Sequence, residues 1–179
     1  MITAAIRRGL LANFPPGTPL DIVAPDGAFD ELVTARNDPS TTLHADAGTV
    51  PAASTNVIVE GIDWVEDPVA LFAQLRAAAP RARLFALASN AAYLPALTAY
   101  FTGAGTSTTR PLVRADVEAV LAAAGWQIIG LEPIAGEAAF AAPEIPGNVT
   151  LGPLTFRIAD AAMLERVQPA AFLAVADPA

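Results

Sequence analysis

The chain has 179 residues, a formal net charge of −8, and neither cysteine nor lysine. This length suits one domain with its own core and is short for two, so we expect a single domain over residues 1–179. The acidic balance argues against a nucleic-acid partner and against an anionic membrane surface, because both need a basic face.

The composition also argues against a membrane-spanning protein and against a secreted one. Hydrophobic residues make up 54% of the chain, yet the apolar runs fall short of the roughly 20 residues that span a membrane. The lack of cysteine fits a reducing compartment, and no secretory signal is expected at the N-terminus, so we expect a cytoplasmic protein. The charge favours a neutral or cationic small molecule or a protein partner, and the apolar content is compatible with a homodimer.

The first half of the chain alternates helix-like and strand-like segments. Proline at the first helical position, with an aspartate before it as cap, predicts that a helix opens at Asp67-Pro68, and Pro80 ends it. Before that helix, the sequence predicts helices over residues 2–11 and 28–36, and strands over 20–24, 41–45 and 56–59.

The second half continues the alternation. It predicts strands over residues 83–88, 126–131, 154–158 and 171–176, and helices over 94–101, 115–124 and 161–166. Residues 103–109 and 133–153 are expected to be loops. The pattern predicts a Rossmann-like, doubly wound α/β fold with a mostly parallel sheet, and a C-terminal hairpin as its antiparallel edge.

A tight turn links the first strand to the next helix. The hydrophobic segment that begins at Leu20 runs into the pair Asp26 and Gly27, and a helix follows. A strand, a turn and a helix in this order normally cradle a nucleotide-like cofactor. The pair Asp26-Gly27 also fits an ordinary turn, and that alternative stays open.

Several short motifs follow this turn in a characteristic order. They are the acidic turn Asp46-Ala47 with Val50-Pro51, the Asp67-Pro68 helix start, Asn90 after its strand, and Ala124-Gly125-Trp126. Their order and spacing resemble the class I S-adenosylmethionine-dependent methyltransferases over roughly residues 19–132.

The resemblance implies a bound S-adenosylmethionine and names candidate residues for it. These are Asp26, Gly27, Asp46 and Ala47. Glu60 is added because a carboxylate at the end of a central strand lies at the crevice where open α/β sheets bind ligands. No catalytic residue is indicated, and Asp46 also fits an ordinary solvated carboxylate.

The chain departs from the family pattern at the cofactor turn. The family's acidic-x-Gly-x-Gly-x-Gly motif falls on Asp21 to Gly27, but Val23 and Pro25 replace its first two glycines. Pro25 lacks an N–H donor, and Val23 is expected to place a branched side chain where the cofactor would lie. Residues 37–45 leave room for one strand where the family has a strand, a helix and a strand, so Asp46 can take one acidic role.

Two hypotheses about function therefore stay open. One is a methyltransferase-like domain with a degenerate cofactor site, and the other is an active small-molecule methyltransferase. No metal site is expected, because His44 is the only histidine and no partner ligands cluster near it in the sequence.

Overall fold

The computed structural model describes residues 2–24, 27–63, 65–104, 112–136 and 140–179. In chain order, the described residues form α1 (Ala4–Ala12), β1 (Leu20–Val23), α2 (Asp30–Arg36), β2 (Thr41–His44), the 3-10 helix η1 (Ala47–Thr49), β3 (Asn56–Glu60), α3 (Pro68–Ala78), β4 (Arg83–Ser89), α4 (Leu94–Phe101), α5 (Arg114–Ala123), β5 (Trp126–Ala135), β6 (Gly147–Leu151), β7 (Leu154–Ile158), α6 (Ala161–Val167) and β8 (Pro169–Pro178).

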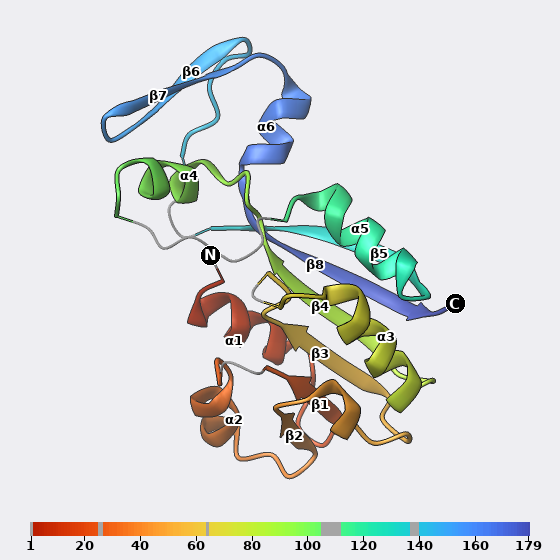
Figure 1. Cartoon of the computed structure of the whole chain (residues 1–179). Coiled ribbons are helices and arrows are strands. Elements are labelled where there is room, and N and C mark those ends of the chain that lie inside the picture. The colour runs from red at the N-terminus through yellow and green to blue at the C-terminus, as the bar shows by residue number, and fades with distance from the viewer. Residues whose placement is uncertain (1, 25–26, 64, 105–111, 137–139) are drawn as a thin grey trace.

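The main sheet has six strands in the order β2-β1-β3-β4-β8-β5 (Figure 1). Strands β2, β1, β3 and β4 are parallel to one another, and β8 lies antiparallel between β4 and β5. The order 2-1-3-4 is that of a doubly wound sheet that reverses between β1 and β3. The predicted fold class, α/β with a mostly parallel sheet and antiparallel strands at its C-terminal end, is confirmed.

The pairing of the last strands differs from the expected hairpin. Strand β7 pairs with β6, which lies inside the stretch predicted to be a loop, while β8 enters the main sheet. A two-residue turn at Gly152 and Pro153 makes Leu151 and Leu154 register partners, and Gly152 has φ 57°. Such a turn closes a hairpin over the shortest chain distance, so β7 pairs with the strand immediately before it.

Both faces of the sheet are buried, as a parallel sheet requires. Alternate residues of β3 show this: Val57 and Val59 pack in the core under α3 and α5, and Ile58 packs in the core under α1 and α2. Figure 1 shows these two helix pairs on opposite sides of the sheet. On the first face, Trp126 Nε1–H also donates to the buried carbonyl of Phe72 at 3.0 Å, which fastens β5 to α3.

The capping residues predicted from the sequence are confirmed at the start of α3 and at the end of α5. The Asp67 carboxylate accepts from Ala70 N–H at 3.0 Å, and Pro68 is the first residue of α3. Gly125 follows α5 with φ 80°, a conformation that glycine adopts without strain. None of the helices in the described part of the chain is both long and apolar enough to cross a membrane.

A third, smaller core lies beyond the carboxyl end of β4, where Figure 1 shows α4, α6 and the β6–β7 hairpin together. Asn90 fastens these elements to the sheet and is 2% exposed. Its side-chain N–H₂ donates to the carbonyls of Arg166 and Pro169, both at 2.8 Å, and its side-chain oxygen accepts from Ala92 N–H at 3.0 Å. One side chain thus joins the end of β4 to the start of β8.

Asn90→Ala is expected to lower the free energy of unfolding by about 2 kcal/mol, because it leaves buried backbone groups without partners. Urea unfolding followed by circular dichroism measures this change. Asn148→Ala, on an exposed position of β6, is the matched control and should change stability by less than about 0.5 kcal/mol. Equal losses in the two variants would contradict the role given to Asn90.

Candidate functional site

The candidate site lies where the strand order reverses, at the carboxyl ends of β1 and β3. Open α/β sheets bind ligands in the crevice outside this point. Gly27 follows β1, Asp46 and Ala47 follow β2, and Glu60 ends β3, so four of the five predicted residues belong to this end of the sheet. The fifth, Asp26, and the neighbouring Pro25 lie outside the described residues.

Gly27 forms a tight turn between β1 and α2. Its N–H donates to the Ala24 carbonyl and its carbonyl accepts from Asp30 N–H, each at 3.1 Å. Its φ is 71°, and a Cβ there would lie 3.2 Å from an oxygen of the Asp30 carboxylate. The turn therefore requires glycine, whether or not a ligand binds beside it.

Val23 does not obstruct the crevice, and that expectation was wrong. The side chain is fully buried in the core under α3, in the same cluster as Val57 and Val59. The register places Val23 beside Val59 on the parallel neighbour, so the pleat turns its side chain toward α3. The missing glycine at this position therefore leaves the crevice free of the valine side chain.

Glu60 is held by an ion pair from the other end of the chain. Arg7 of α1 donates through Nε–H to Oε1 at 3.0 Å and to Oε2 at 2.8 Å, and its Nη2 also bonds Oε1. The Glu60 side chain is 4% exposed and that of Arg7 is 18% exposed. The guanidinium carbon also lies 5.9 Å from the ring centre of Phe29, within reach of a cation–π interaction. The carboxylate at the reversal point is thus neutralised by an internal cation.

Arg7 is the residue that sequence reasoning missed. It lies 53 positions from Glu60, and no motif links the two. The available signal was an arginine pair, Arg7-Arg8, within an otherwise apolar helix. That pair does not indicate which arginine turns inward or which carboxylate it meets.

Asp46 begins the turn after β2, the strand beside β1, and its carboxylate is engaged by the chain. Its Oδ1 accepts from Gly48 N–H at 2.7 Å, which caps η1, and from the Gln74 side chain of α3 at 3.0 Å. Ala47 is 1% exposed and belongs to the core under α3. The space for one strand between α2 and Asp46 is filled by β2, as predicted.

His44 joins a polar network on the α3 side of the sheet. Its Nε2 lies 2.7 Å from Asp21 Oδ1, and its Nδ1 lies 3.2 Å from the hydroxyl of Thr49. That hydroxyl donates to the Asp46 carbonyl at 2.7 Å, so the network ties β1, β2 and η1 together. Within the described ranges, no three His, Cys, Asp or Glu side chains form a group that could hold a metal ion.

Tyr93 lies at the same end of the sheet, after β4 and just before α4. It is 6% exposed, and its backbone N–H donates to the Asn90 carbonyl at 3.2 Å. Burial raises the pKa of the Tyr93 phenol above its usual value of 10.0. The phenol therefore stays protonated at neutral pH.

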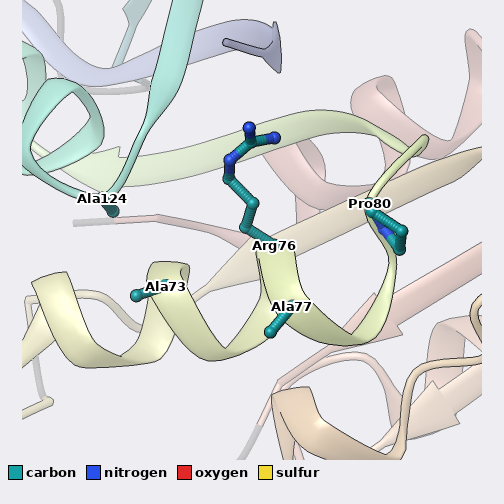
Figure 2. A pocket seen from close by; sticks show the side chains of 5 residues that line it. All are labelled: Ala73, Arg76, Ala77, Pro80 and Ala124. Carbon is teal, nitrogen blue, oxygen red and sulfur yellow. The ribbon is translucent and has the colours of Figure 1, made fainter.

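A separate shallow hollow of about 440 Å³ lies at the opposite end of the sheet, near the start of β4. Figure 2 shows its lining of small side chains and Arg76 between α3 and α5. The Arg76 guanidinium donates a hydrogen bond to the backbone carbonyl of Ala179. The lining residues are Ala73, Arg76, Ala77, Pro80 and Ala124.

Several solved methyltransferases have this fold. A SAM-dependent methyltransferase from Archaeoglobus fulgidus is 13% identical, with a TM-score of 0.57 over 97% of this chain and 91% of its own. N,N-8-amino-8-demethyl-D-riboflavin dimethyltransferase (RosA) from Streptomyces davawensis is 15% identical, with a TM-score of 0.55 over 97% of this chain. Magnesium protoporphyrin IX methyltransferase (ChlM) from Synechocystis PCC 6803, solved with bound SAH, is 12% identical, with a TM-score of 0.50 over 98% of this chain and 80% of its own.

These likenesses establish the fold and no more. The chain has the class I fold of S-adenosylmethionine-dependent methyltransferases, at sequence identities too low to carry over an activity. It spans 46% of the length of the riboflavin dimethyltransferase. No protein-family model matches the sequence, and no curated protein matches it.

Gly27→Ala is expected to lower the free energy of unfolding by about 1–2 kcal/mol, because the Cβ of alanine crowds the backbone at positive φ. Gly9→Ala is the matched control: Gly9 lies inside α1 with open space around it, and alanine there should stabilise the protein by about 0.5–1 kcal/mol. Chemical denaturation of both variants measures the two changes. A neutral or stabilising Gly27→Ala would show that the turn does not require positive φ.

Proposed function

We propose that this chain is a methyltransferase-like domain whose cofactor site is degenerate, and that it acts as a binding module rather than as a catalyst. The observation that carries the proposal is the ion pair between Arg7 and Glu60 at the reversal point of the sheet. A ligand in this crevice meets the Glu60 carboxylate, and both oxygens of that carboxylate already accept hydrogen bonds from the Arg7 guanidinium.

The charge of the cofactor strengthens this argument. S-adenosylmethionine carries a positive sulfonium and a positive ammonium group. Because Arg7 already neutralises Glu60, this carboxylate offers little net attraction to either positive group of the cofactor. We infer that the residues at this crevice do not fit the cofactor while α1 holds Arg7 in place.

Two further features support the proposal. The Asp46 carboxylate caps η1 and accepts from Gln74 through the same oxygen, Oδ1, so a ligand hydroxyl at that oxygen would have to compete with both donors. In the sequence, Pro25 removes an N–H group from the turn that would face the cofactor. The partner of such a module would be a small molecule or a protein, and a homodimer is compatible with the apolar content of the chain.

An active small-molecule methyltransferase is the second candidate. It is favoured by the Gly27 turn, which keeps a positive φ, and by the exposed position of Asp46 beside the end of β1. In that function the cofactor would supply the methyl group and its own leaving group. The chain would contribute binding and alignment of the two reactants.

Isothermal titration of the wild-type protein with S-adenosylmethionine and S-adenosylhomocysteine separates the two functions. The degenerate site predicts no saturable heat up to about 1 mM ligand, and a Kd in the micromolar range would contradict it.

If the wild-type protein does bind S-adenosylmethionine, the variant Asp46→Ala tests whether Asp46 belongs to the binding site. A cofactor-binding role for Asp46 predicts a Kd at least about tenfold weaker, or 1.4 kcal/mol. Asp67→Ala is the matched control, since Asp67 also caps a helix through its carboxylate but belongs to α3, and its Kd should be unchanged. Equal affinities in wild type and Asp46→Ala would exclude Asp46 from the site.

A further inference from the structure

We propose that the last turn of α4 is a self-association surface, through which two copies of this chain form a weak dimer about a twofold axis. Tyr100 and Phe101 are the centre of this surface, and we call the pair the aromatic end of α4. The proposal is independent of the proposed function, because α4 follows β4 whereas the cofactor crevice lies at the ends of β1 and β3 (Figure 1).

An apolar stripe along α4 extends beyond the third core. Leu94 is 2% exposed in that core, and Leu97, three residues later, packs against it partly buried. Tyr100 and Phe101 follow Leu97 by three and four residues, so they continue the stripe on the next turn. There they are 56% and 66% exposed. The third core therefore covers the start of the stripe and leaves its end exposed.

The two exposed rings contact each other. Their centroids lie 5.6 Å apart at an interplanar angle of 72°, which is an edge-to-face contact. Because the rings already restrict each other, less rotamer freedom is lost when a partner covers them. Aromatic side chains are also enriched in the buried centres of protein interfaces. The aromatic end of α4 thus differs from a single exposed apolar side chain, which needs no explanation.

The charge of the chain favours a second copy as the partner. The sequence has 10 basic and 18 acidic residues, yet it has no charged residue between Arg83 and Arg110, and α4 lies within this segment. Two copies that each carry a formal net charge of −8 repel each other where their charges meet. They approach at least cost where neither copy presents a charge. A basic partner would instead be recognised by carboxylates, which α4 lacks.

The exposed area sets the expected strength of the dimer. A large aromatic residue buries about 150–250 Å² when it is covered, so the exposed fractions of Tyr100 and Phe101 offer roughly 250 Å² per copy. Each residue is used twice in a twofold contact, once from each copy. A contact centred on so short a helix end belongs with the weak interfaces that bury less than about 1,200 Å² in total. We therefore expect a Kd of roughly 10–100 μM.

Sedimentation of the protein over a range of concentrations tests this surface. Phe101→Asp is expected to raise the Kd of the dimer at least about tenfold, because two like charges then meet in the contact. Ile129→Asp is the matched control, because Ile129 on β5 is 53% exposed and its replacement adds the same charge outside α4. The Kd of this control should stay within about twofold of the wild-type value.

A mixture of charge variants tests the twofold geometry. Phe101→Asp and Phe101→Arg should each be largely monomeric alone, and an equimolar mixture should form dimers, because opposite charges then face each other. Phe101 is exposed, so both variants should keep the circular dichroism spectrum of the wild-type protein.

The proposal is overturned if the wild-type protein stays monomeric up to about 0.5 mM, and the aromatic end of α4 would then be left to a different protein. It is also overturned if Ile129→Asp weakens the dimer as much as Phe101→Asp does, or if the mixture of the two Phe101 variants stays monomeric. None of these results bears on the titration with S-adenosylmethionine, which decides the proposed function separately.

Discussion

The ion pair between Arg7 and Glu60 is the interaction on which the ligand end of this protein depends. A carboxylate that is 4% exposed is stable only when it is paired, and removal of one member of such a pair typically destabilises a protein by about 3–5 kcal/mol. The pair joins α1 to the end of β3 at the point where the sheet reverses. It sets both the charge of the crevice and the position of the helix that covers it.

The sheet explains why these two residues meet. Alternation along β3 turns Val57 and Val59 toward α3, and it turns Ile58, two residues before Glu60, toward α1. The chain before β1 forms α1 on that face, so Arg7 faces the carboxylate across the end of the strand. The short connection from α2 through β2 to η1 leaves one strand beyond β1, and Asp46 lies at the start of the turn after it.

Local signals made most of the fold predictable from the sequence. Asp67 and Pro68 marked the start of α3, Gly125 marked the end of α5, and apolar runs located the parallel strands. Relations between distant residues were not predictable. The orientation of Val23 depends on strand register, β8 enters the sheet by pairing with β4 and β5, and Arg7 meets Glu60 across 53 positions. Gly27, Asp46 and Glu60 lie at one end of the sheet, but the partners that contact the two carboxylates come from α1, η1 and α3.

A double-mutant cycle over Arg7→Ala and Glu60→Ala, followed by urea unfolding, measures how strongly this ion pair couples α1 to the end of β3. A coupling free energy of about 2 kcal/mol or more is expected, because each single variant removes one member of a largely buried ion pair. The parallel cycle with Arg8→Ala in place of Arg7→Ala should give a coupling near zero. A coupling below about 0.5 kcal/mol between Arg7 and Glu60 would contradict the claim that this ion pair holds α1 over the crevice.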